Sequence, residues 1–299
     1  MSKWYKLAPL ERWKPRMEST WALRTFKQYD CEFKRLFASF NSAKKYTYSH
    51  LKQDGAVYTD QATKYLATRN TKLTIKNWSD DFNLFDNWVR LNLLMSICSY
   101  FETYMSSVIA ESIESDPGLI FGCYHDIDGI ALLKKGHKVS KTKLNNKITE
   151  CIKGDWNSRM SNLQKLYGQV PELMSKNISL LEKIRKLRNE VGHAFGRDIE
   201  QSKNYEIIKI SAMHKLSAVT FLKYHKFLYD IARSLDLFLL NNHIGNYEPL
   251  FYLHNIYETI KNLDKGEKMI AFKKSMGSEI NGQFSKDFCR QIIVYYENL

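Results

Sequence analysis

The side chains best suited to chemistry lie in the stretch Leu187-Arg188-Asn189-Glu190-Val191-Gly192-His193. If one helix ran through this stretch, the five positions from Arg188 to His193 would turn the imidazole about 140° away from the guanidinium. Glycine commonly ends helices, because it adopts left-handed backbone conformations without strain. We therefore expect the helix to stop at Gly192 and His193 to fold back toward the cleft that Arg188 and Asn189 face.

These residue types suit a phosphodiester. A guanidinium holds a phosphate, and an imidazole moves protons near neutral pH. The sequence contains no P-loop, GxGxxG, HExxH or GxSxG motif, which narrows the function to a nuclease or a binding module. The simplest alternative is an ordinary helix C-terminus, at which Arg and His complement the helix dipole and Gly caps the helix.

The spacing R-N-x-x-x-H resembles the signature of the HEPN superfamily, whose small helical domains include many metal-independent endoribonucleases. The resemblance implies an antiparallel helical bundle with the motif near the end of about its third helix. It also implies catalytic roles for Arg188, Asn189 and His193 and an active site shared by two subunits. Similar decorated domains occur in toxins and in abortive-infection proteins of bacterial phage defence.

An endoribonuclease of this type would cleave RNA by attack of the ribose 2′-OH, so it needs no metal-activated water. His193 would be the base on the 2′-OH, or the acid to the leaving 5′-oxygen in a paired subunit. Arg188 would neutralise the phosphorane charge, and Asn189 would fix the geometry. Because acid–base cleavage needs two groups and the chain has one motif, we expect a homodimer. An antitoxin, protein or RNA, is a further candidate partner.

Two other function classes stay open. One is a non-catalytic HEPN-like protein that binds RNA or a nucleotide. The other is a basic all-α interaction protein in which the motif is a coincidence.

Glu102 falls on an apolar helix face between Cys98 and Met105, where an unpaired acid is costly. Arg188 is its expected partner, with Arg185 and Arg197 as rivals. HEPN proteins often carry an acid on an early helix that orients the motif arginine. The alternative is an ordinary solvent-exposed glutamate on the helix flank. Arg197 is also a candidate for an additional phosphate contact, although a basic loop residue needs no such role.

The net charge of +13 indicates a polyanionic partner, of which nucleic acid is the commonest. A merely solvated basic surface is the alternative. The candidate RNA contacts are lysines in one basic segment, namely Lys134, Lys135, Lys138, Lys141 and Lys143. A basic N-terminal arm adds further cations beside aromatic side chains, among them Lys3, Lys6, Arg12, Lys14 and Arg16 beside Trp4, Tyr5 and Trp13.

No metal site and no cofactor is expected. The five cysteines are scattered without a CxxC pair, which indicates a reduced cytoplasm, no disulfide framework and no zinc site. The stretch His125-Asp126-Ile127-Asp128-Gly129 lacks the later glutamate of a calcium loop and is expected to be a turn. The chain start lacks the apolar stretch of a secretory signal. No apolar run approaches the roughly 20 residues that span a bilayer, so no membrane association is expected.

Apolar spacing predicts an all-α fold of antiparallel helices around one core. A HEPN-like bundle would occupy residues 82–243, with a basic extension at 1–80 and a helical tail at 245–299 packed on the bundle. Helices are expected at 20–46, from Ser79-Asp80-Asp81 to Asp116, from Pro171 into the motif, at 216–238, at 247–263 and at 284–298. The last two would be separated by a loop containing Gly277 and Gly282. Residues 120–168 are expected to be loop-rich, with one short helix near 143–153.

Overall fold

The computed structural model describes residues 7–204, 210–280 and 284–299. This part of the chain is all-α, as predicted, and contains no strand, only an isolated bridge between Gln61 and Thr74. Contacts group the chain into two compact units. The motif unit consists of residues 25–103 and 177–230, and the terminal unit consists of residues 1–24, 104–176 and 231–299.

These units differ from the three consecutive domains expected from the sequence. The expected boundary at residues 80–82 falls inside helix α2 (Ile75–Ser115), which continues without a break. The expected boundary at residues 243–245 falls at the end of η4 (Leu240–Ile244). Each unit is built from segments far apart in the sequence, which a reading of local patterns along the chain does not reveal.

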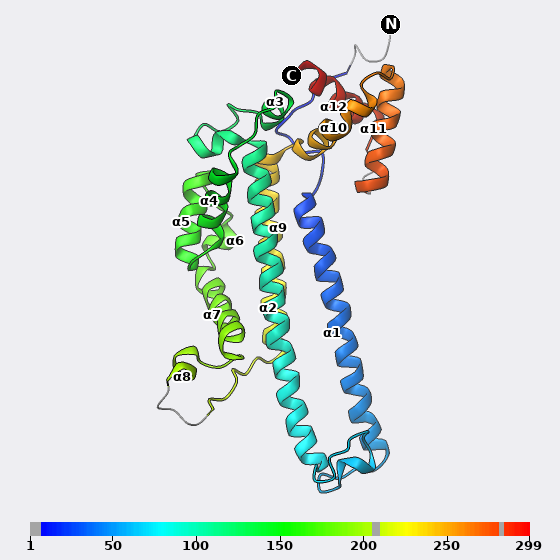
Figure 1. Ribbon diagram of the computed structural model, residues 1–299, viewed down its shortest axis with the longest axis vertical. Coiled ribbons are helices and arrows are strands. Elements are labelled where there is room, and N and C mark those ends of the chain that lie inside the picture. Colours follow the sequence, from blue (N-terminus) through cyan, green and yellow to red (C-terminus); the bar gives the residue numbers. More distant parts are fainter. Residues whose placement is uncertain (1–6, 205–209, 281–283) are drawn as a thin grey trace. The chain divides into compact units, whose positions relative to one another are not determined.

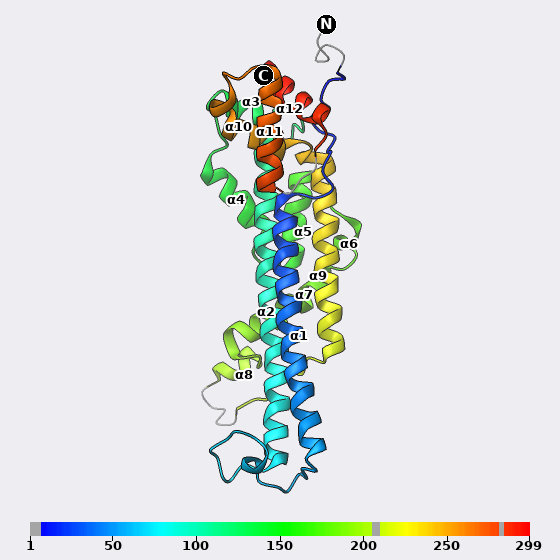
Figure 2. The same cartoon turned by 90° about the vertical axis from the view of Figure 1, so that its right-hand side faces the viewer.

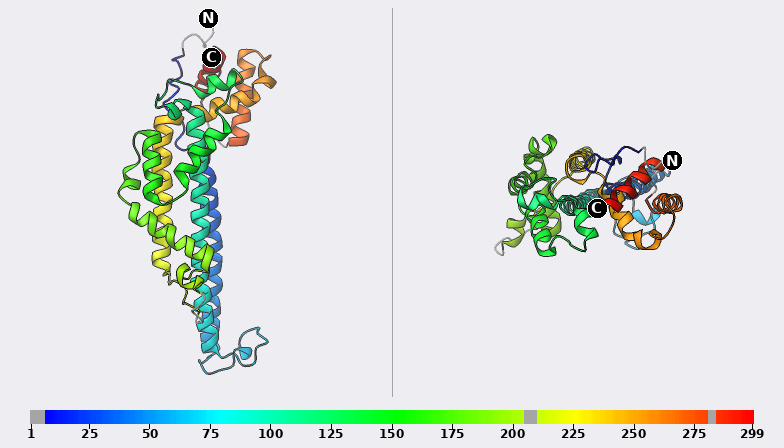
Figure 3. Two further views of the ribbon diagram at one scale, coloured as in Figure 1. Left: turned by 60° about the vertical axis from the view of Figure 1, so that its left-hand side comes forward. Right: turned by 90° about the horizontal axis from the view of Figure 1, so that it is seen from above.

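An antiparallel pair of long helices, α1 (Trp21–Gln53) and α2, frames the motif unit (Figures 1 and 2). Residues 54–74, which include the short helix η2 (Ala62–Lys64), join the two helices at one end of the pair (Figure 3). Phe26 packs edge-on against Phe101, with ring centroids 6.5 Å apart, and Phe40 stacks on Phe82 at 6.3 Å. The aromatic stripe that predicts a helix at 20–46 therefore packs against α2.

Helix α2 begins about one turn earlier than predicted. Its first turn is capped by Thr74, whose Oγ1 accepts a hydrogen bond from the Asn77 backbone N–H at 3.2 Å. Ser79-Asp80-Asp81 therefore lies inside the helix, although serine and aspartate are typical of helix starts. The C-terminal end of α2 is at Ser115, directly before Asp116-Pro117-Gly118, as predicted.

Within the described residues, one helix, α2, meets the length and composition criterion for a bilayer-crossing helix. Its most apolar window of 18 residues has a mean hydropathy of 1.2, and 44% of that window is buried within the protein. Only its length and its hydropathy mark α2 as a candidate membrane-crossing helix, and buried core helices of globular proteins also pass this test.

The motif unit is completed by α7 (Ile178–Ala194), the short α8 (Ile199–Lys203) and α9 (Ala218–Leu239). Phe221 of α9 is fully buried and lies 5.8 Å from the ring of Phe33. The helix expected after Pro171 is divided: α6 (Glu172–Ser175) ends first, and α7 starts anew after Asn177, whose carbonyl accepts the Leu181 N–H at 3.0 Å.

In the terminal unit, residues 120–168 contain more helix than predicted. They form α3 (Gly129–Lys134), α4 (Lys141–Ile152) and α5 (Trp156–Tyr167), after the short η3 (Pro117–Phe121). Aspartate side chains start two of these helices. Asp128 accepts the Ile130 N–H at 3.1 Å, and Asp155 accepts the Ser158 N–H at 2.9 Å.

The tail forms three helices that contact one another, α10 (Tyr247–Ile260), α11 (Lys265–Ile280) and α12 (Lys286–Asn298) (Figure 2). Helix α11 occupies most of the expected loop and contains Gly277, whereas Gly282 lies outside the described residues. Between α9 and α10 the chain forms one turn of π-helix, η4, and then turns sharply at Gly245. A Cβ atom at Gly245 would lie 2.4 Å from the Arg12 carbonyl oxygen, so only glycine fits there.

Candidate functional site

The motif lies on the last turns of α7 in the motif unit. Leu181, Ile184, Leu187 and Val191 recur at intervals of three and four and form the buried face of this helix. Arg188 and Asn189, which follow the buried Leu187, are half-buried. The apolar stripe therefore determines which side of α7 carries the candidate phosphate-binding groups.

The helix does not stop at Gly192. It continues through His193 to Ala194, and the left-handed residues are Phe195 and Gly196, with φ of 56° and 73°. The Gly196 N–H donates to the Glu190 carbonyl at 3.0 Å, which closes the helix. Glycine permits a helix end without requiring one. Here the turn comes later, where the Phe195 ring packs 5.9 Å from the ring of Trp88.

His193 therefore does not fold back toward Arg188. Because the helix is continuous, the two side chains leave it about 140° apart, and His193 is exposed. The expectation that the cation, the amide and the imidazole converge within one chain is wrong.

The predicted pairing of Glu102 with Arg188 is confirmed. Arg188 Nη2 lies 3.2 Å from Glu102 Oε2, and Arg188 Nη1 donates to Asn189 Oδ1 at 3.1 Å. The Arg188 and Glu102 side chains are 32% and 29% exposed, so the pair is open to solvent on one side. The guanidinium is thus fixed by an acid and an amide and remains within reach of a ligand.

The rival arginines have other partners. Arg185 forms a two-point contact with Glu182 on its own helix, at 2.9 and 2.6 Å. Arg197 donates to the carbonyls of Ser211 and Phe195 at 2.9 and 3.3 Å, and its guanidinium lies 5.0 Å from the Phe195 ring centroid. Arg197 therefore holds the connection after α7 in place. This structural role was not predicted from the sequence.

Sequence reasoning missed a groove between α7 and the start of α9. Its volume is about 690 Å³, and its lining includes Lys183, Lys186, Glu190, His214 and Lys215. Lys186, Glu190 and His193 are spaced by four and three, so the exposed imidazole continues the helix face that lines this groove. The groove therefore gathers three ammonium groups, and the helix face that lines it leads to the candidate proton-transfer residue.

His214 adds a second imidazole to the groove. Its Nδ1 lies 3.6 Å from Glu190 Oε2, and its backbone N–H donates to the Gly196 carbonyl at 2.6 Å. The sequence spacing between His214 and the motif follows no recognisable rule. The fold of the connection after α7 brings them together.

The candidate RNA-binding lysines belong to the terminal unit. Lys135, Lys138, Lys141 and Lys143 are exposed. Lys134 differs, because its Nζ donates to the Tyr296 and Glu297 carbonyls at 2.6 and 3.1 Å. Its charge therefore stabilises the C-terminal end of α12.

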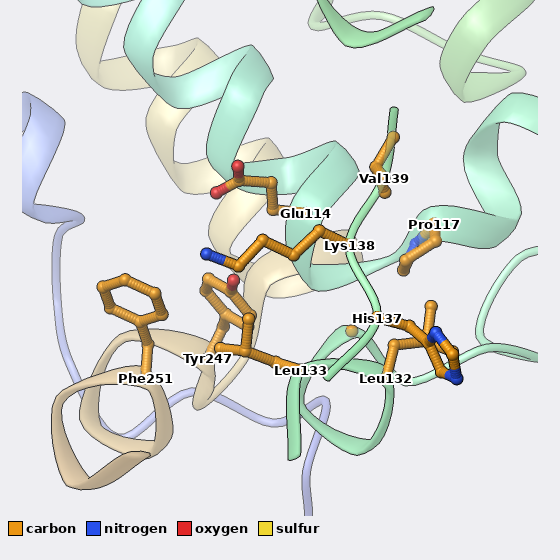
Figure 4. A pocket seen from close by; sticks show the side chains of 10 residues that line it. Glu114, Pro117, Leu132, Leu133, His137, Lys138, Val139, Tyr247 and Phe251 are labelled. Carbon is orange, nitrogen blue, oxygen red and sulfur yellow. The ribbon is translucent and has the colours of Figure 1, made fainter. Parts of the chain in front are cut away.

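A smaller pocket of about 120 Å³ lies in the terminal unit (Figure 4). Lys138 extends across it toward Tyr247, on the same side of the pocket as Glu114 (Figure 4). Burial raises the pKa of the Glu114 carboxyl above its usual 4.5, and the Lys138 charge opposes this rise. The volume is below the roughly 300 Å³ at which ligand pockets usually begin.

Comparison with protein-family models, curated proteins and solved structures finds no match to this chain. The resemblance to the HEPN superfamily therefore rests on the R-N-x-x-x-H spacing alone.

Proposed function

We propose that this protein is a metal-independent endoribonuclease that acts as a homodimer. The observation that carries the proposal is the ordered Glu102–Arg188–Asn189 set, together with an exposed imidazole one and a half turns further along the same helix. A fixed guanidinium stabilises the charge that develops on phosphorus, and a solvent-exposed imidazole exchanges protons near neutral pH.

The reaction needs no activated water. A base removes the proton from the ribose 2′-OH, the 2′-oxygen forms a bond to phosphorus, and the bond from phosphorus to the 5′-oxygen breaks. An acid returns a proton to the departing 5′-oxygen. The products are a 2′,3′-cyclic phosphate and a 5′-OH, so RNA is cleaved and DNA is not.

Two copies of the chain supply the pair of proton-transfer groups. Within one chain, Arg188 and His193 point to different sides of α7. In a dimer with two-fold symmetry, the two exposed His193 side chains can meet at the axis, so that one imidazole acts as base and the other as acid. The expected mass in light scattering is about twice the chain mass of 35.2 kDa.

The decisive experiment is cleavage of purified RNA by the purified full-length chain in EDTA. Arg188→Ala and His193→Ala should each abolish cleavage with unchanged far-ultraviolet circular dichroism. Arg185→Ala, on the same helix but paired with Glu182, should retain activity. Loss of wild-type cleavage in EDTA, restored by magnesium, would reject the metal-independent mechanism.

The groove favours a second candidate function, binding of RNA or a nucleotide without cleavage. Its volume falls in the range of small-molecule sites, and Lys183, Lys186 and Lys215 offer phosphate contacts. This function predicts that Lys186→Gln weakens RNA binding, while intact RNA is recovered from the wild-type protein.

The cellular role that follows from cleavage is that of a toxin or an anti-phage abortive-infection effector, held inactive by a protein or RNA antitoxin in the cytoplasm. Expression of the wild-type chain should then arrest growth, and expression of His193→Ala should not. Equal growth of the two strains, with both proteins present at equal amounts, would contradict this role.

A further inference from the structure

Three potential metal ligands from separate segments meet in the terminal unit: Asp116, His125 and His243. Their donor atoms all lie within 4.8 Å of one another. Asp116 Oδ2 is 3.1 Å from His243 Nδ1 and 3.8 Å from His125 Nε2. The carbonyl oxygen of Asn242 lies 2.5 Å from His125 Nε2 and adds a fourth donor.

The backbone is irregular at both histidines. His125 has a left-handed φ of 64°, which is uncommon outside glycine. His243 belongs to the π-helical turn η4, and such turns are rare and frequent at functional sites. Left-handed residues other than glycine also concentrate at ligand-binding sites, because surrounding contacts must stabilise them. Two independent irregularities therefore present the two imidazoles to one carboxylate.

The surroundings hold the cluster in place and leave one side open. Asp116 is completely buried, and its Oδ1 also accepts the His125 backbone N–H at 3.1 Å. The Trp13 ring stacks on the His125 ring, with centroids 4.1 Å apart. The His125 side chain is nevertheless 40% exposed, so an ion and a water molecule can enter from solvent.

We infer that Asp116, His125 and His243 form a binding site for a divalent transition-metal ion of the Zn²⁺ type. Two imidazole nitrogens and one carboxylate oxygen suit such an ion, whereas Mg²⁺ and Ca²⁺ prefer oxygen ligands alone. Four ligands about 2.1 Å from an ion lie roughly 3.0–3.5 Å apart, so small side-chain movements complete the site.

The site differs from the calcium loop that the D-x-D sequence suggests. Asp128 is already engaged, because its carboxylate binds Arg12 Nε at 3.0 Å and starts α3. The second histidine comes from a position more than a hundred residues away in the sequence, which is why no ligand spacing was visible. The expectation of no metal site is replaced here by this proposal.

The proposal is independent of RNA cleavage, since the motif residues belong to the other unit. Bound metal would link the end of α2, the loop after η3 and the π-helical turn. It would thereby stabilise the terminal unit by binding the folded state alone.

Calorimetric titration with ZnCl₂ tests the site on untagged full-length protein that has been stripped with a chelator. One ion per chain should bind, and His125→Ala, which removes a ligand, should lower the affinity by at least the roughly 10–100-fold that loss of an outer-shell partner costs. The matched control is His137→Ala, which changes another exposed histidine of the terminal unit outside the cluster. This variant should bind as the wild type does. Absence of saturable binding, or equal affinity in His125→Ala and wild type, would show that the cluster is only hydrogen-bonded.

A second measurement uses the wild-type chain alone. Zn²⁺ should protect the exposed His125 from diethyl pyrocarbonate, with the modified sites located by mass spectrometry, and should leave His137 reactive. Equal modification of His125 with and without Zn²⁺ would overturn the proposal.

Discussion

Replacing Gly192 with alanine tests whether α7 runs through the motif. In the structure Gly192 is an exposed helical residue, and an added Cβ would lie 3.8 Å from Met95 Sδ, an ordinary contact. An alanine in a helix is more favourable than a glycine by about 0.5–1 kcal/mol. The substitution should therefore raise the free energy of unfolding by that amount and the melting temperature by roughly 2 °C.

Gly196→Ala is the matched control, because Gly196 adopts the left-handed conformation that closes the helix. With φ at 73°, an added Cβ would lie 2.8 Å from Cδ1 of the buried Leu91. The left-handed backbone alone costs a residue with a side chain about 1–2 kcal/mol. Gly196→Ala should therefore destabilise the protein by at least this amount.

Urea unfolding followed by circular dichroism measures both variants against the wild type, with unchanged slopes as the check on comparability. The two substitutions should shift the midpoint in opposite directions. If Gly192→Ala lowers the midpoint as much as Gly196→Ala does, Gly192 has the left-handed backbone, and the helix ends where the sequence suggested.

Three further predictions concern charge, assembly and RNA contacts. Burial raises the pKa of Glu248 from 4.5 to about 7, so between these pH values the folded state keeps a proton that the unfolded chain releases. The free energy of unfolding should therefore fall as the pH rises from about 4.5 to about 7. Glu248→Gln should flatten this fall in urea midpoints at pH 5 and 8; an equal fall in both proteins would contradict it. Wild-type protein can be mixed with a nine-fold excess of His193→Ala and left to exchange subunits. If the active form is a homodimer that needs both imidazoles, cleavage per wild-type chain should fall to about one tenth, because only one wild-type chain in ten then has a wild-type partner. A monomeric enzyme would show no loss. Changing Lys138, Lys141 and Lys143 together to Gln should weaken RNA binding and reduce the slope of log affinity against log salt concentration. An unchanged slope would show that these lysines are solvated and do not contact RNA.

The Glu248 prediction follows from a close pair of buried carboxyl groups. Glu248 Oε2 and Glu111 Oε1 are both closed to solvent, and the two side chains hydrogen-bond each other through one proton. Burial raises the pKa of Glu111 too, and the Glu248 charge adds to the rise. A glutamine at 248 offers an N–H in place of the shared proton. It should therefore remove the repulsion that appears when both groups ionise.

Local patterns predicted most of the helices, because the helix period depends on neighbouring residues alone. The predicted stripes are borne out in part: Phe26 and Phe33 of α1 and Ile184, Leu187 and Val191 of α7 are buried, whereas Leu36 and Leu173 are exposed. The contact of Glu102 with Arg188 was also predictable, since an acid on an apolar face requires a cation on the facing helix. Errors were concentrated at helix ends. Thr74 rather than Ser79 starts α2, and Phe195 with Gly196 rather than Gly192 ends α7.

The sequence by itself determined the all-α class, the amphipathic faces and the residue types available for phosphate chemistry, because these follow from composition and periodicity. Only the tertiary structure decided what surrounds those residues. It separated His193 from Arg188 around a continuous helix, gave Lys134 and Arg197 structural partners and brought His214 to the groove. It also joined Asp116, His125 and His243 across more than a hundred residues. Such contacts depend on how distant segments pack, and no local pattern records them.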